Sequence, residues 1–371
     1  MSGAGHLYVH LPFCAHRCGY CDFVTAVGRP ADHAPYVDAL LAELALERDA
    51  LAPELETIFL GGGTPTFAAP AELERLLAAL PEALEVTVEA NPETVTPELG
   101  ALLRANRVTR ISLGAQSFQP ALLDMLERVA QPDDVRRAVY LLRDAGFDNI
   151  SLDLIYGIPG QTPAALERDL AEALALAPEH LSAYELEAKP GTRFTHAHGD
   201  ELVRQAESME SYFEQVVETL TGAGFRWYET ANFCRGADRD PAGRDLRSRH
   251  NLGYWLGHDY LGLGVGAVST IENRRWRNAP SLAGYVKALA AGERPRREYE
   301  ELPVATREFE RVMLGLRLDE PLSVGDGVGV LDPAGVARAE RLGLAVRDGA
   351  ELALTERGRF LGDAVTAELL A

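Results

Sequence analysis

The first half of the chain repeats one pattern, in which a short β-rich apolar run is followed by a loop and a longer amphipathic segment. This alternation predicts strands joined by helices through right-handed crossovers, and therefore a parallel sheet. It fits an open doubly wound sheet as well as a complete or partial barrel. The predicted strands are Leu7–Leu11, Thr57–Leu60, Val86–Ala90, Arg110–Leu113, Ile150–Ile155 and His180–Tyr184. The predicted helices between them are Tyr36–Leu51, Ala71–Leu80, Pro97–Ala105, Asp133–Ala145 and Pro163–Leu176.

Unusual residues follow these predicted strands, at the point where each strand ends. The segments are GGGTPT at 61–66, VEANP at 88–92, GAQSF at 114–118 and DLIYG at 153–157. The carboxyl ends of parallel strands meet at one face, so the sequence predicts a single site there. A glycine run allows backbone to approach a ligand closely, although by itself it is equally a loop with a turn at Pro65.

The chain is strongly acidic, with 36 Lys and Arg against 56 Asp and Glu and a formal net charge of −20. This charge repels phosphate backbones and argues against nucleic acid as a partner. The start of the chain lacks the basic and apolar regions of a signal peptide, and no apolar run of about 18 residues follows. We therefore expect a soluble, cytoplasmic protein. Four cysteines in 371 residues suit a metal site better than a disulfide framework.

After residue 184 the alternation of strands and helices stops. A helix is predicted near Ala206–Ala223, and a glycine-rich stretch covers Gly253–Gly266. From about Pro303, two predicted helices and a hairpin around Arg347-Asp348-Gly349 resemble a small α+β winged-helix-like module. Its acidic setting favours packing or protein interaction over DNA binding. These patterns divide the chain into 1–200, 201–302 and 303–371.

Three cysteines, Cys14, Cys18 and Cys21, follow the first predicted strand within eight residues. Three thiolates on one loop leave one iron of a four-iron cluster open to another ligand. The competing interpretation is a zinc site completed by His16 or another histidine, although structural zinc sites usually use paired C-x2-C elements.

The spacing C-x3-C-x-aromatic-C, with Tyr20 as the aromatic residue, resembles the signature of radical S-adenosylmethionine (SAM) enzymes. The resemblance implies a partial (β/α)6 barrel with a [4Fe-4S] cluster whose open iron binds SAM. Carried over from the coproporphyrinogen dehydrogenase branch, it also implies a set of contacts to SAM. These contacts are Tyr8, Gly62, Gly63, Thr64, Glu89, Gln116, Arg128 and Asp153.

A second cluster of polar and aromatic residues is His250-Asn251-x-x-Tyr254-Trp255. An ordinary core corner would look similar. Together with Tyr228-Glu229 and Asn232-Phe233 upstream, however, it resembles the HemW family of haem chaperones over nearly the whole chain. That resemblance implies haem as a ligand and haem-accepting proteins as partners. It further implies an electron donor for the cluster and peripheral association with membrane respiratory proteins, and it leaves the oligomeric state open.

Two features favour the chaperone over the related oxygen-independent coproporphyrinogen III oxidase, a radical SAM decarboxylase. The oxidase pattern has a further cysteine where this chain has Phe23, and only thirteen residues precede Cys14 here. Radical methylation or opening of haem is a third alternative that the sequence does not separate. Cys234 departs from the family pattern and is expected to have no role, and the segment 235–249 is expected to be a mobile surface loop.

Overall fold

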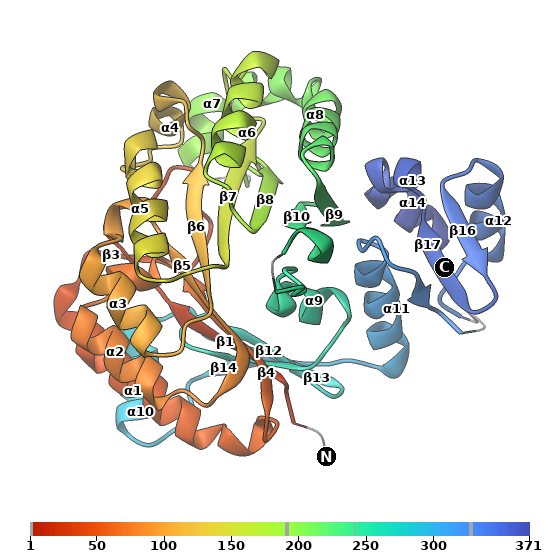
Figure 1. Cartoon of the computed structure of the whole chain (residues 1–371). Helices are drawn as coiled ribbons and strands as arrows, with labels where there is room; N and C mark the ends of the chain where they lie inside the picture. Colours follow the sequence, from red (N-terminus) through yellow and green to blue (C-terminus); the bar gives the residue numbers. More distant parts are fainter. Residues whose placement is uncertain (1–2, 190–192, 241, 326–328) are drawn as a thin grey trace.

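The computed structural model describes residues 3–189, 193–240, 242–325 and 329–371. Its main feature is a curved sheet of twelve strands in the order β14-β13-β12-β11-β1-β4-β5-β6-β7-β8-β10-β9 (Figure 1). The parallel strands are β1 His6–Leu11, β4 Leu55–Gly62, β5 Ala83–Ala90, β6 Arg110–Gln116, β7 Ile150–Tyr156, β8 His180–Glu185 and β11 Tyr260–Leu263. The antiparallel flanks are β9 Phe225–Glu229, β10 Asn232–Arg235, β12 Val268–Ile271, β13 Arg274–Asn278 and β14 Arg297–Glu301.

Helices cover the convex side of this sheet (Figure 1). They are α1 His33–Leu46, α2 Pro70–Ala79, α3 Pro97–Ala105, α4 Pro120–Met125, α5 Pro132–Asp144 and α6 Pro163–Ala175, with α10 Leu282–Ala290 packed on α1. The helices α2 to α6 all begin with proline, which lacks an amide proton and has a backbone angle already suited to the first helical position. Thr96 and Thr162 cap two of these starts, each accepting a hydrogen bond from a backbone amide three residues later.

The two faces of the parallel strands differ sharply in polarity. On β1, Leu7 and Val9 belong to the apolar layer under the helices, whereas His6 and His10 lie on the concave side. The same alternation puts a polar row inside the barrel on the other strands. These inward residues are Thr57, Glu85, Thr87, Glu89, Arg110, Ser112, Ser151, Asp153, His180 and Ser182.

A short helix inside the curve, α9 (Arg249–Trp255), packs on β4 on the concave side of the sheet (Figure 1). The Glu85 carboxylate accepts the backbone N–H groups of Arg249 and His250, each at 3.2 Å. These bonds satisfy amides at the start of the helix, which have no partner within it. At the level of α9, the interior of the barrel therefore contains buried polar contacts.

The predicted partial (β/α)6 barrel is confirmed, and all six predicted strands are present. The structure adds β11 as a seventh parallel strand beside β1, in the glycine-rich stretch where we expected no strand. Close packing requires a glycine at position 262 of β11, because a Cβ there would overlap the carbonyl oxygen of Val268. Two helix bounds were wrong: α1 ends at Leu46, and the region near 206–223 holds the end of α7 (Arg193–Ala206) and then α8 (Met209–Gly222).

The C-terminal part has a core of its own, which includes Val312, Leu352 and Leu369. Its elements are α11 Val304–Gly315, β15 Leu322–Ser323, α12 Pro333–Arg341, β16 Ala345–Asp348, β17 Glu351–Leu354, α13 Glu356–Phe360 and α14 Gly362–Leu369. The sheet order β15-β17-β16 gives the hairpin of a winged-helix-like module. This separate core supports a domain division near residue 303, which remains a proposal. In the described ranges, no helix is long and apolar enough to cross a membrane.

Described residues of the segment 235–249 make specific contacts, and the expected mobility of this segment stays a prediction. Arg244 contacts Asp240 at 2.9 Å and Asp148 at 3.0 Å, and Leu246 is buried beside Cys234. Residue 241 lies outside the described ranges. Burial in this small apolar cluster also raises the pKa of the Cys234 thiol to about 12, so the thiol is protonated and unreactive at neutral pH.

A buried carboxylate joins the first helix to the far edge of the sheet. Glu43 on α1 is fully buried and accepts hydrogen bonds from the Gly264 amide, the Asn278 side chain, the Tyr285 hydroxyl and the Arg297 guanidinium. Arg297 is also buried, with 4% of its side chain exposed, so its charge depends on this partner and on Glu47. Removing one member would leave the others unsatisfied.

We predict that Glu43→Ala lowers the free energy of unfolding by roughly 3 kcal/mol or more, because it leaves Arg297 as a buried charge with one acid fewer. Urea unfolding followed by circular dichroism measures the change. Glu74→Ala, at an exposed position on α2, is the control and should change the free energy by less than about 0.5 kcal/mol. Equal stability of the two variants would contradict this account of the network.

Candidate cofactor site

A cavity of about 470 Å³ opens at the carboxyl ends of the central parallel strands. The cysteine loop forms one wall, and the ends of β4, β5, β6 and β7 form the other. Most of the residues that the sequence predicts for the site lie around it. These are Cys14, Cys18, Cys21, Gly62, Gly63, Thr64, Glu89, Gln116, Arg128, Asp153 and Asn251.

The cysteine loop is held by backbone hydrogen bonds. Cys14 ends β2 (Phe13–Cys14), which pairs with β3 (Ala26–Val27), and its carbonyl accepts the Gly28 amide at 2.9 Å. The Cys21 amide donates to the Cys18 carbonyl at 3.2 Å, which forms a tight turn. Burial raises the pKa of the Cys14 and Cys21 thiols, so coordination to a metal is what would keep them ionised.

The spacing of the cysteine sulfurs argues against a single zinc ion. Within the described ranges, only His6, Glu56 and His258 form a group of three His, Cys, Asp or Glu side chains with ligand atoms all within 4.8 Å of one another. Sulfurs around one zinc ion, with Zn–S of about 2.3 Å, would lie roughly 3.8 Å apart. Moreover, the His16 ring nitrogen Nε2 lies 3.8 Å from a Glu127 carboxylate oxygen. The donor set fits a larger cluster and does not fit the zinc alternative.

Arg128 is buried against the cysteine loop. One of its terminal nitrogens lies 3.6 Å from the Cys18 sulfur, and the other donates to the Asn91 side chain at 2.9 Å and to the Gly114 carbonyl at 3.0 Å. These bonds fix the guanidinium beside the thiols, and they exclude the ordinary surface ion pair that an arginine in an acidic stretch would form. Its positive charge there stabilises sulfur ligands in the thiolate form.

The glycines that end β4 are required by close backbone packing. A Cβ on Gly63 would lie 2.7 Å from the Pro12 carbonyl carbon, and one on Gly62 would overlap the His10 ring. Gly62 also has φ of +108°, a conformation that other residues rarely adopt. The strand end can therefore lie directly against the cysteine loop, and the Gly62 amide donates to Glu89 at 3.1 Å.

Two carboxylates face this cavity from β5 and β7, the strands on either side of β6. Burial and the nearby Asp153 raise the pKa of Glu89 to about 7. Burial also raises the pKa of Asp153, opposed by hydrogen bonds from Ser112 at 2.8 Å and Ser151 at 3.2 Å. A cation in the cavity would favour the ionised form of both acids. The arrangement is suited to an ammonium or a ribose diol.

Four predicted residues lie outside this cavity wall. The Tyr8 hydroxyl contacts His10 at 3.0 Å, and the ring stacks on Phe59, which does line the cavity. His250 is buried below it: Nδ1 lies 2.7 Å from the Thr57 hydroxyl and Nε2 lies 3.1 Å from the Tyr254 hydroxyl. Burial lowers the pKa of His250 to about 3, so the ring is neutral. Trp255 lies under the Arg317 guanidinium, 4.6 Å from its ring centre.

Sequence reasoning missed several residues of the cavity wall. They include Arg110, Ser112, Ser182, Tyr184 and Lys189. The sequence contains a signal for some of them, because Ser112 lies two residues after Arg110 and Ser182 lies two residues after His180 on buried strands. A period of two in polar residues within otherwise apolar parallel strands indicates an inner face that holds a ligand or a network.

The comparisons with known proteins agree with this geometry. A family model described as the Radical SAM superfamily matches residues 8–173, across the cysteine loop and the first strands. Coproporphyrinogen III oxidase (HemN) from Escherichia coli has the same fold, with a TM-score of 0.81 and 23% identity over 99% of this chain and 90% of that chain. The segment 8–173 thus matches the radical SAM class, and the whole chain shares the fold of this oxidase.

Relatives with higher sequence identity indicate a particular family within this class. The heme chaperone HemW of Mycobacterium tuberculosis (strain ATCC 25618 / H37Rv) is 38% identical over 98% of this chain and 94% of its own length. That of Bacillus subtilis (strain 168) is 33% identical over 98% of both chains. This chain belongs to the HemW family.

We predict that Gly63→Ala lowers the iron bound after anaerobic reconstitution to less than about half, because a Cβ contact under 3 Å with backbone must displace the cysteine loop. Iron and sulfide analysis measures the loss. Gly199→Ala is the matched control, since a Cβ there meets nothing within 4 Å. Equal iron in both variants would show that the close approach does not position the loop.

Proposed function

We propose that this chain binds haem and delivers it to haem-accepting proteins, with a [4Fe-4S] cluster and SAM held in the barrel cavity. The proposal rests on its near full-length similarity to proteins named heme chaperones, together with Phe23. Phe23 lines the cavity and is 62% exposed, at the position where the oxidase pattern has a further cysteine. A phenyl ring offers no ligand to iron, which favours a carrier over the decarboxylase.

In this proposal, the thiolates of Cys14, Cys18 and Cys21 hold three irons of the cluster. The backbone of Gly62 and Gly63 and the Glu89 carboxylate bind the amino group of SAM, while Asp153 accepts hydrogen bonds from its ribose. Bound there, the cluster would supply an electron to the sulfonium. Thr64, Gln116 and Arg128 complete the cavity wall, with Arg128 opposing the negative charge of the sulfur ligands. Tyr8 stacks on Phe59, which lines the cavity in its place, so a contact between Tyr8 and SAM stays a prediction.

The remaining partners follow the same proposal. An electron donor would dock at the exposed side of the cysteine loop, and the haem acceptors would include respiratory proteins reached by peripheral contact with the membrane. A cytoplasmic location suits both partners.

We predict that SAM binds about tenfold more weakly at pH 6 than at pH 8. Below a pKa of about 7 Glu89 is protonated and loses its attraction for an ammonium group. Calorimetric titration of the cluster-loaded protein measures the affinity. Glu89→Gln should flatten much of this pH dependence, whereas Glu98→Gln, fully exposed on α3, should keep it. An identical pH profile for Glu89→Gln and the native chain would contradict the role of Glu89.

The location of haem is constrained by the burial of His250. Both of its ring nitrogens lie within hydrogen-bonding distance of hydroxyls inside the barrel, so iron ligation would need the ring to leave Thr57 or Tyr254. A larger cavity of about 950 Å³ lies between the barrel and the C-terminal helices. This volume is at the upper end of the roughly 300–1,000 Å³ typical of small-molecule sites.

The walls of this interdomain cavity suit a flat apolar ring with acidic substituents. Its apolar lining includes Tyr156, Met209, Phe213, Phe309, Met313 and Phe360. Arg359 stacks on Trp227 at 3.7 Å, and its Nε and one terminal nitrogen are buried without a hydrogen-bond partner. Burial lowers the pKa of Arg359 to about 10, so it remains charged at neutral pH. A haem propionate would supply the missing acceptor, although Glu185, Glu210 and Asp363 also line the cavity and restrict where it can lie.

We therefore place haem in the interdomain cavity, with the segment 250–255 as the alternative location. Arg317 joins the two, since it lines the cavity and also covers Trp255. In the interdomain cavity the haem would contact the C-terminal part of the chain, whereas in the alternative location it would contact α9, whose Asn251 lines the cofactor cavity.

We predict that Arg359→Gln weakens haem binding by about tenfold, because it removes a charge-assisted hydrogen bond. Anaerobic titration followed at the Soret band measures the affinity. Ala367→Trp, at an exposed position on α14 that lines the cavity, should block binding without disturbing the core. Arg296→Gln, exposed near β14, should bind haem normally. If His250→Gln loses the Soret shift while Arg359→Gln and Ala367→Trp bind haem normally, haem lies at the alternative location. If the native chain shows no Soret shift, the proposal of haem binding is wrong.

A further inference from the structure

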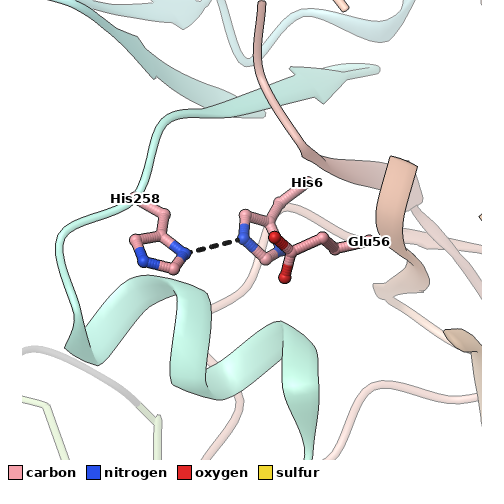
Figure 2. Close-up of side chains that lie close together, drawn as sticks. All are labelled: His6, Glu56 and His258. Atoms are coloured by element: carbon pink, nitrogen blue, oxygen red, sulfur yellow. Dashed lines mark hydrogen bonds between the residues drawn. The ribbon is translucent and has the colours of Figure 1, made fainter. Parts of the chain in front are cut away.

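Three potential metal ligands converge at the end of the barrel opposite the cysteine loop (Figure 2). His6 begins β1, Glu56 lies near the start of β4, and His258 lies in the turn between α9 and β11. One ligand atom of each lies within 4.8 Å of the other two, which no other such group in the described ranges achieves. We propose that His6, Glu56 and His258 bind a zinc ion.

The spacing of the two histidines is close to what a shared metal requires. His6 Nε2 and His258 Nδ1 lie 3.1 Å apart, and the rings stack at 25° with centroids 5.3 Å apart. Nitrogens bound to one tetrahedral zinc at about 2.0–2.1 Å lie roughly 3.4 Å apart. A small outward movement of His258, which is exposed, reaches that distance, and His6 is buried and fixed. Glu56 supplies an anionic third ligand from the solvent side, and water would complete the set.

Thr57 orients the buried histidine for this role. Its hydroxyl lies 2.9 Å from His6 Nδ1 and 2.7 Å from His250 Nδ1, and its single proton can be donated to only one of them. When Thr57 donates to His250, His6 donates its Nδ1 proton to Thr57 and presents an unprotonated Nε2 outward. That tautomer is the one a metal binds.

Zinc binding would therefore fix the direction of a whole chain of hydrogen bonds. With Thr57 donating to His250 Nδ1, the His250 proton lies on Nε2 and is donated to the Tyr254 hydroxyl at 3.1 Å. The chain runs from the surface, through His6 and Thr57, to the floor of the barrel. Occupancy at the surface would thus select one tautomer of the buried His250.

The ligand types favour zinc over magnesium and calcium. Two imidazoles with one carboxylate suit zinc, whereas magnesium and calcium prefer oxygen-only sets. The set contains no sulfur, so it is chemically distinct from the cysteine loop and can be studied while that loop is occupied. It also joins positions 6, 56 and 258, which are far apart in sequence, and does not depend on the proposed haem function.

The test uses cluster-loaded protein incubated with zinc sulfate under argon and then desalted. We expect about one zinc per chain with unchanged iron, and a zinc X-ray absorption edge showing nitrogen and oxygen ligands without sulfur. His258→Ala and Glu56→Gln change exposed side chains, so both should fold. His258→Ala should lose the zinc, and Glu56→Gln should bind it at least about tenfold more weakly.

His198→Ala provides the matched control. His198 Nδ1 lies 3.1 Å from Glu201, a histidine–carboxylate pair that has no third ligand among the residues that the structure describes, so this variant should keep its zinc. Nitrogen-15 spectra of the histidines should also show His250 shifting to the Nε2-protonated tautomer when zinc is added to the native chain. No retained zinc in the native chain, equal zinc in His258→Ala, or sulfur among the ligands would overturn the proposal.

Discussion

The buried guanidinium of Arg110 is the interaction on which the inside of the barrel depends. Arg110 is 2% exposed on β6, and its charge lowers the pKa of Glu85, Glu89 and Asp153 against the effect of their burial. The same charge opposes protonation of His250. This buried cation thus offsets part of the cost of burying three acids and adds to the effect of burial that keeps His250 neutral. Glu85 uses this to hold the start of α9, and Glu89 and Asp153 use it to face the cofactor cavity.

The outer layer of the fold could be predicted from the sequence because its rules are local. The six strands are apolar runs at regular spacing, and the predicted helices at Pro97 and Pro163 begin where α3 and α6 begin. The strand β11 could not be predicted in this way, because its four residues include a glycine and its partner β1 lies some 250 positions away in sequence. Its strand conformation is fixed by pairing and not by propensity.

The candidate site likewise has one part that sequence motifs predict and another that only the structure shows. Cys14, Cys18, Cys21 and the glycines of β4 carry a motif that can be read along the chain, and the structure places them around one cavity. His250 shows the limit of such motifs, since sequence spacing does not indicate that Thr57, 193 positions away, would engage Nδ1, which together with Tyr254 on the next helical turn occupies both ring nitrogens. Arg359 carries no motif at all. It becomes noticeable only when α13 packs beside β9 and leaves two of its nitrogens buried without acceptors.

The central claim is that this chain carries haem and leaves it chemically unchanged. The direct measurement is anaerobic incubation of the cluster-loaded protein with SAM, a reductant and either haem or coproporphyrinogen III, followed by product analysis after an apo-haemoprotein is added. The account predicts that unmodified haem is recovered on the acceptor and that coproporphyrinogen III is returned intact. Formation of protoporphyrinogen, or of methylated or ring-opened haem, would contradict it.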